Sequence, residues 1–210
     1  MMHLCGVGGV REEFVWGGDV ADVSTGLASP TLLFGHIPYM TQTFEAISPY
    51  EMVLLCKSPV DHVLSLAKSM FDARAQRPDQ VWMRNNLSVE DVIEHIVRGY
   101  EIEGVRIGSY SDMFSDFVCK WVPHAAFTLR MDQLVPLQPE VITRIANLAG
   151  VELPSDWEYR VSRGARQEIS ATYMPTFHSD KAEAYRDIAQ RLLEEAAPSA
   201  LDCYDGICPR

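Results

Sequence analysis

Short apolar runs alternate along this chain with longer stretches in which apolar and polar residues mix. Several of the runs have the length and composition of strands buried on both faces, which is typical of a parallel sheet. They cover residues 31–34, which Gly35 ends, 52–56 and 125–130. A further run at residues 2–7 predicts a strand that leads into a loop at Gly8 and Gly9.

Between and after these runs, apolar residues recur at helical spacing. Ser58 is placed to cap the first helix, and Pro59 to take its first position. Ser88 with Asp91 suggests a second cap, and Gly150 is placed to end a later helix. The expected helices cover residues 59–71, 88–97, 111–122, 139–148 and 179–193.

Polar stretches separate these elements. Residues 17–30 and 74–84 predict exposed loops, residues 154–178 show no clear period, and residues 202–208 predict a small C-terminal loop. Strands that alternate with helices indicate an α/β fold with three layers around a mainly parallel central sheet. The length of 210 residues suits a single domain over residues 1–210.

Composition and charge exclude several classes of protein. The chain has 18 Lys and Arg against 29 Asp and Glu, a net charge of −11, which disfavours nucleic acid as a partner. No apolar run approaches the roughly 20 residues of a membrane helix, so no membrane span is expected. The amino terminus lacks the pattern of a signal peptide, and we therefore expect a cytoplasmic protein.

The cysteines, five in number, are scattered along the chain. An odd and scattered set resembles neither a disulfide framework nor a zinc cluster, so we expect no metal site. Free thiols are the expected state in a reducing cytoplasm, while Cys203 and Cys208 are close enough in sequence to pair if oxidised.

Candidate chemistry lies where the predicted strands end, because ligands of such folds bind at the carboxyl ends of the strands. Gly8 and Gly9 allow backbone N–H groups to approach a phosphate, although a plain glycine turn has the same sequence. His36 has the chemistry of a general base, and a structural histidine is the alternative. Lys57 supplies a cation at a helix amino terminus, with Ser65 two turns along the same face; a solvated pair is the alternative.

In this order, these features resemble the sulfotransferases that use 3′-phosphoadenosine 5′-phosphosulfate (PAPS). The segments "GHIPY" and "VLLCKSPVDHVLSLAKSM" are similar to a strand ending near His-x-Pro and a strand running into Arg-Asp-Pro-x-x-x-x-x-Ser. In the second pattern, Lys57 stands at the Arg position and Ser65 at the Ser position. "SYSDMFSDFVCKWVPHAAFTLRMDQLV" and "ITRIANLAGVELP" resemble the helix, Trp, strand and following helix of that family.

The resemblance implies a P-loop NTPase-like sulfotransferase topology and transfer of a sulfuryl group from PAPS to a hydroxyl or amine, without a metal. It makes His36 the catalytic base, and it gives the 3′-phosphate to Lys57 and Ser65. The resemblance implies that the backbone amides of the glycine loop bind the 5′-phosphosulfate. It also implies that a later basic-glycine segment, which contains Arg163 and Gly164, lies against the 3′-phosphate. The residues that it assigns to the nucleotide are Gly6, Val7, Gly8, Gly9, Val10, Arg11, Lys57, Ser65, Arg163 and Gly164.

Two departures from the family pattern keep alternatives open. The glycine loop has Gly6 where the family has a Lys that balances charge on the leaving phosphate, and Lys-Ser replaces Arg-Asp at residues 57–58. A non-catalytic relative that keeps the fold as a nucleotide-binding or partner-binding module is the second hypothesis. A P-loop kinase is the third, and the absence of Gly-Lys-Ser/Thr counts against it.

Overall fold

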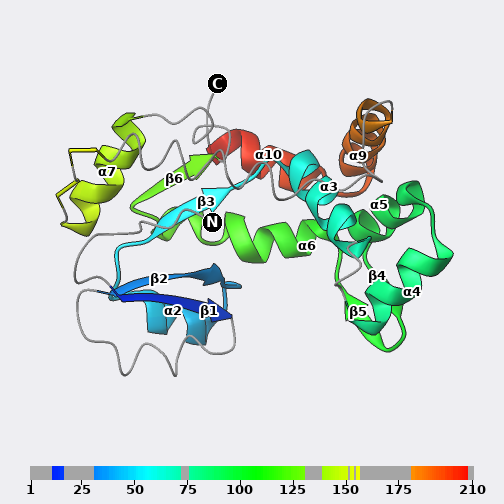
Figure 1. Ribbon diagram of the computed structural model, residues 1–210, viewed down its shortest axis with the longest axis horizontal. Coiled ribbons are helices and arrows are strands. Elements are labelled where there is room, and N and C mark those ends of the chain that lie inside the picture. Colours follow the sequence, from blue (N-terminus) through cyan, green and yellow to red (C-terminus); the bar gives the residue numbers. More distant parts are fainter. Residues whose placement is uncertain are drawn as a thin grey trace. The chain divides into compact units, whose positions relative to one another are not determined.

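The computed structural model describes residues 11–16, 31–71, 76–130, 139–150, 152–153, 155–156 and 181–207 (Figure 1). These residues form a mixed α/β protein in which two strand pairs are parallel. The chain divides into two compact units, each made of two stretches of chain. The first unit comprises Met1–Cys56 and Asp116–Thr172, and the second comprises Lys57–Ser115 and Tyr173–Arg210.

The first unit contains both parallel pairs. Strand β1 (Arg11–Trp16) pairs with β2 (Thr31–His36), and β3 (Val53–Cys56) pairs with β6 (Phe127–Arg130) (Figure 1). The predicted strands at 31–34, 52–56 and 125–130 are thereby confirmed to within a few residues, and β2 continues through Gly35. The sequence analysis predicted no strand at β1, and the strand predicted at residues 2–7 lies outside the described residues.

Trp121 and Ile47 form the buried centre of the described part of this unit. Ile47 belongs to α2 (Thr41–Ile47), and Trp121 follows a π-helical segment, Ser115–Cys119, and precedes a short 3₁₀ turn, Val122–His124. Helix α7 (Pro139–Ala149) begins with its proline and is followed by Gly150 at a φ of 65°, as predicted. The guanidinium of Arg144 on α7 lies 4.3 Å from the centre of the Phe127 ring on β6.

The second unit is mainly helical. Helices α3 (Pro59–Met70), α5 (Val89–Arg98) and α9 (Ala182–Ala196) pack against one another (Figure 1). The predicted caps of α3 and α5 are confirmed, because the Ser58 and Ser88 hydroxyls accept the backbone N–H of Asp61 and Asp91. Helix α9 follows Lys181, and its predicted caps at residues 179–180 lie outside the described residues. Among the large aliphatic side chains that these three helices bury fully are Val63, Val92, Ile93, Val97 and Leu193.

Other elements of this unit differ from the prediction. A β-hairpin joins β4 (Tyr100–Ile102) to β5 (Val105–Ile107), and the helix predicted at 111–122 is α6 (Tyr110–Phe114) continued by the π-helical segment. The C-terminal loop prediction is wrong through Ile207, since α10 (Pro198–Ile207) occupies it. A proline at the first helical position starts this helix, and Ala200 and Tyr204 bury one side of it.

The prediction of an exposed loop at residues 74–84 is wrong from Pro78 onward. Helix α4 (Pro78–Asn86) begins there, because proline fits the first helical position as well as it fits a loop. The carboxylate of Asp79 on its first turn is fully buried. It accepts hydrogen bonds from the Arg77 guanidinium at 2.5 and 3.0 Å and from the Tyr100 hydroxyl at 2.7 Å. Burial alone would raise the pKa of Asp79, but these hydrogen bonds hold it below its ordinary value.

Replacing Asp79 with alanine is expected to lower the free energy of unfolding by about 2–4 kcal/mol, because the buried Tyr100 hydroxyl loses its acceptor. The lowered pKa places this stabilisation at neutral pH and removes it as the pH falls below about 4. Urea unfolding at pH 7 and pH 3 measures both effects. Glu94→Ala, which removes an exposed carboxylate, is the control and should change stability by less than about 1 kcal/mol. A difference in the free energy of unfolding between wild type and Asp79→Ala that is larger at pH 3 than at pH 7 would contradict this prediction.

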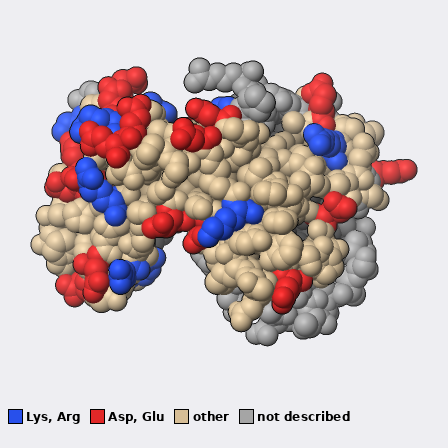
Figure 2. All heavy atoms as spheres, turned by 180° about the vertical axis from the view of Figure 1, so that it is seen from behind, with Lys and Arg blue, Asp and Glu red and all other residues tan. Residues whose placement is uncertain are grey.

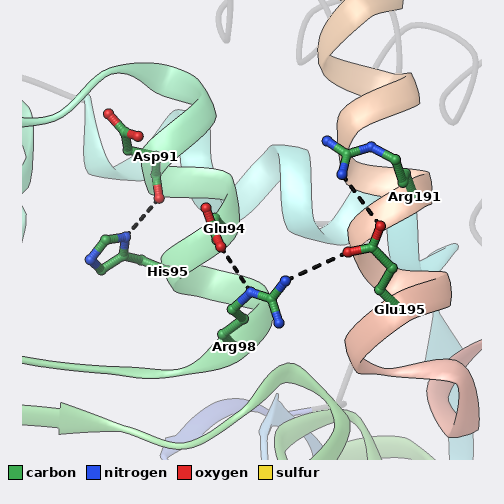
Figure 3. A network of polar contacts seen from close by, with 6 residues as sticks. All are labelled: Asp91, Glu94, His95, Arg98, Arg191 and Glu195. Atoms are coloured by element: carbon green, nitrogen blue, oxygen red, sulfur yellow. Dashed lines mark hydrogen bonds and ion pairs between the residues drawn. The ribbon is translucent and has the colours of Figure 1, made fainter.

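Ion pairs on the surface of the second unit connect α5 to α9 (Figure 3). Arg98 pairs with Glu94 at 2.9 Å and with Glu195 at 3.6 Å, and Arg191 pairs with Glu195 at 3.4 Å. In Figure 2 most basic side chains on the visible face lie beside acidic ones. Within the described residues, no helix has the length and apolar composition to cross a membrane.

The described cysteines differ in oxidation state. Cys119 and Cys203 each take part in a disulfide bond, whereas Cys56 is a buried thiol. The expectation of free thiols is therefore wrong for Cys119 and Cys203. Disulfide bonds persist mainly in oxidising compartments, so they do not favour the cytoplasmic location that the amino terminus suggested.

Candidate functional site

The junction between strand β3 and helix α3 presents a cation at a helix amino terminus. Lys57 directly follows β3, and Ser58 is the N-cap of α3. In the first helical turn Pro59 has no N–H and the N–H of Asp61 donates to the Ser58 hydroxyl, which leaves the N–H of Val60 for an anion beside the lysine. Strand β3 is parallel to β6 and ends at Cys56, so Lys57 is the first residue after the carboxyl end of a parallel strand. Such positions are the usual ligand sites of α/β proteins, and the partial positive charge of the helix start favours an anion.

Lys57 is partly buried, and this burial lowers the pKa of its ammonium group, while the nearby Asp61 carboxylate raises it. A partly desolvated ammonium interacts more strongly with a phosphate than a fully solvated one, because the effective dielectric is lower. The junction therefore has the electrostatic character of a small anion site in an acidic protein.

An acidic side chain already occupies part of this helix start. Asp61 accepts a hydrogen bond from the Ser58 hydroxyl at 2.6 Å and one from the Arg186 guanidinium of α9 at 2.6 Å. Burial would raise the pKa of Asp61, but the bonds from Ser58 and Arg186 lower it, so the carboxylate is charged at neutral pH. The charge of Asp61 opposes an incoming phosphate, and Arg186 lies within reach of the same helix turn.

Ser65 is exposed on α3. It lies seven residues after Ser58, which corresponds to about 10 Å along the helix axis and nearly the same face. A phosphate that contacts both Lys57 and Ser65 must therefore lie along the side of α3, with the lysine side chain extended in that direction.

His36 is the last residue of β2 and is exposed. In the parallel register it lies opposite Trp16, the last residue of β1, so it marks the carboxyl edge of this pair. Its position at a strand end is the one that the sequence predicted for a general base.

Arg11 lies at the opposite end of the same pair. It is the first residue of β1 and is opposite Thr31, five residues before His36 along β2. At about 3.3 Å per residue, the backbones of Arg11 and His36 are roughly 16 Å apart along the strands. The structure therefore does not bring Arg11 to the edge where His36 lies, and Arg11 belongs to a strand that the sequence analysis did not predict. The remaining predicted nucleotide residues, Gly6, Val7, Gly8, Gly9, Val10, Arg163 and Gly164, lie outside the described residues.

Sequence reasoning missed Asp61 and Arg186 as parts of the α3 start. The spacing of Ser58 and Asp61 is that of a capping box, which is a signal for Asp61 that the sequence carries. Arg186 is 125 residues away along the chain, and only the packing of α9 against α3 brings it there. No local pattern in the sequence reports that contact.

The family resemblance places a phosphate at this junction, so Asp61→Asn is expected to tighten the binding of adenosine 3′,5′-bisphosphate (PAP), the product nucleotide of that family, by about three- to tenfold at low salt. At a partly exposed site, removing a negative charge near the phosphate strengthens binding by about 1 kcal/mol. The substitution also frees the Arg186 guanidinium from its ion pair with the Asp61 carboxylate. The matched control is Asp91→Asn, which changes the equivalent residue in the capping box of α5. Both variants should remain folded, and only the first should change affinity. Equal affinities in calorimetric titrations of the two variants would contradict a phosphate site at α3.

Neither a scan against models of known protein families nor a search of curated proteins finds a match for this chain. The assignment of the β3–α3 junction therefore depends on the residues and geometry of the chain itself.

Proposed function

We propose that this protein is a PAPS-dependent sulfotransferase that moves a sulfuryl group to a hydroxyl or amine of a small-molecule or glycan acceptor. The observation that carries the proposal is the β3–α3 junction, where the partly buried Lys57 precedes a capped helix at the carboxyl end of a parallel strand. In the sequence, this junction carries the segment that resembles the 3′-phosphate site of the family. The three-layer P-loop topology is part of the same proposal.

In the proposed reaction, Lys57, the backbone N–H of Val60 and the Ser65 hydroxyl hold the 3′-phosphate of the donor. A ring nitrogen of His36 takes the proton of the acceptor group as its oxygen or nitrogen bonds to sulfur. The bond between sulfur and the phosphate oxygen breaks, and PAP leaves with that electron pair. Such a transfer needs positioning and anion stabilisation more than covalent help from the protein, as phosphoryl transfer does.

A second candidate function is a nucleotide-binding or partner-binding relative without catalysis. Two observations favour it. Asp61 places a negative charge at the proposed phosphate site, and Arg11 lies at the strand end opposite to His36. Arg11, which the resemblance assigns to the nucleotide, therefore begins its strand at the end away from the proposed base.

Two measurements on the purified chain test the proposal and separate it from the alternative. Calorimetric titration with PAP reports binding, and incubation with labelled PAPS and a panel of hydroxyl and amine acceptors reports transfer. Binding with transfer supports the sulfotransferase, and binding without transfer to any acceptor supports the non-catalytic relative. No heat at high PAP concentration rejects the sulfotransferase and the nucleotide-binding relative, and favours a relative that binds a partner instead.

A further inference from the structure

The backbone that follows His36 is held by buried side chains of the same unit. The indole Nε1–H of Trp121 donates to the carbonyl oxygen of Ile37 at 2.8 Å. The hydroxyl of Thr43 donates to the carbonyl oxygen of Pro38 at 2.7 Å. Trp121 and Thr43 are each 3% exposed, so water does not compete freely for either bond.

A third bond fixes the next residue. The N–H of Tyr39 donates to the carbonyl oxygen of Asp116 at 2.8 Å, and the Thr43 hydroxyl oxygen also accepts the N–H of Met40 at 2.9 Å. Pro38 has a fixed φ and no N–H of its own. The carbonyl oxygens of Ile37 and Pro38 and the N–H groups of Tyr39 and Met40 thus have partners on α2, on the π-helical segment and at Trp121, which leaves the exit of β2 little freedom to turn.

The geometry points to Thr43 and Trp121 as positioning residues for His36. The inference rests on the proposed role of His36 as the base. A general base must lie within about 2.6–3.2 Å of the proton that it removes, and a displacement of about 1 Å lowers the rate about a hundredfold. We call the hydrogen bonds of Trp121 and Thr43 to the carbonyl oxygens of Ile37 and Pro38 the clamp. Because the clamp acts on the backbone immediately after His36, it sets the direction in which the imidazole leaves the sheet. Neither Thr43 nor Trp121 contacts a substrate in this account.

The test compares Thr43→Val, which keeps the shape and removes the hydroxyl, with Thr43→Ser, which keeps the hydroxyl. For Thr43→Val we expect kcat to fall about tenfold, with KM and PAP affinity within about twofold of wild type. Thr43→Ser should restore kcat to within about twofold of wild type. An equal kcat for wild type and Thr43→Val, or an equal loss in both variants, overturns the inference.

Two readouts do not depend on activity and separate this inference from the proposed function. Hydrogen exchange of the Met40 amide, whose acceptor is the Thr43 hydroxyl oxygen, should be about five- to tenfold faster in Thr43→Val than in wild type or Thr43→Ser. The ring chemical shifts of His36, measured by nuclear magnetic resonance at one fixed pH, should differ from wild type in Thr43→Val and match wild type in Thr43→Ser. If PAP does not bind and nothing is transferred, these readouts still decide whether the clamp orders His36; unchanged exchange and ring signals reject it.

Trp121→Phe provides a second variant, in case Thr43→Val fails to fold. It removes the indole N–H and retains an aromatic ring in the core beside Ile47. We expect faster exchange of the Tyr39 amide and changed His36 ring chemical shifts at one fixed pH. Wild-type values for both in a folded Trp121→Phe protein would overturn the role of Trp121.

Discussion

Lys57→Ala is expected to weaken PAP binding by about ten- to a hundredfold, because a charge-assisted hydrogen bond to phosphate contributes about 1.5–3 kcal/mol. The lysine is partly buried beside the amino terminus of α3, so its loss also leaves the phosphate facing the Asp61 carboxylate. Calorimetric titration at fixed ionic strength measures the effect. Lys120→Ala is the matched control, because it removes one positive charge from an exposed ion pair with Asp116 and should leave the affinity unchanged.

Lys57→Arg refines this prediction through its pH dependence. The pKa of Lys57 is lowered by burial, so in wild type the affinity should fall at a less alkaline pH than an exposed lysine would give. Arginine stays charged throughout this range, so the variant should lose less affinity as the pH rises. An alkaline loss of equal size in both proteins would show that Lys57 is not the group that titrates.

His36→Ala is expected to lower kcat by about a hundred- to ten-thousandfold, the usual contribution of a general base, while PAP affinity stays within about twofold of wild type. The separation follows from the proposed roles, since His36 acts on the acceptor and Lys57 on the nucleotide. Steady-state rates and calorimetry on the same preparation measure both quantities.

His95→Ala is the control for His36. The His95 ring lies on α5 and hydrogen bonds to the Asp91 carbonyl oxygen at 2.8 Å, far in sequence from the proposed chemistry (Figure 3). Its replacement should leave kcat within about twofold of wild type. If His36→Ala weakens PAP binding as much as Lys57→Ala does, the division of roles between the two residues is wrong.

Local sequence patterns were sufficient for many elements of the fold. The caps at Ser58 and Ser88 and the apolar strands at β2, β3 and β6 depend on neighbouring residues, so the sequence predicts them. The sequence predicts a loop at Pro78 and no helix at Pro198, but each proline is the first residue of a helix. Proline is common both in loops and at the first helical position, so its presence alone does not distinguish the two. Strand β1 was missed because its Arg-Glu-Glu start lacks the apolar run that marks a strand buried on two faces.

In the candidate site, too, local sequence predicted some residues, whereas contacts from distant segments could not be predicted. Lys57 and His36 were predicted because each directly follows or ends a recognisable strand. The contacts that decide their chemistry come from distant segments: Arg186 at Asp61, and Trp121 at the carbonyl oxygen after His36. Such contacts depend on how helices and strands pack, and the local periodicity of one segment carries no information about them.

The central claim is that the start of α3 holds the 3′-phosphate of the donor. The most direct test is the ratio of two affinities of the wild-type protein, one for PAP and one for adenosine 5′-monophosphate, which lacks the 3′-phosphate. The account predicts that PAP binds at least about tenfold more tightly and that Lys57→Ala brings the two affinities close together. Equal affinities in wild type, or a preference that survives in Lys57→Ala, would contradict it.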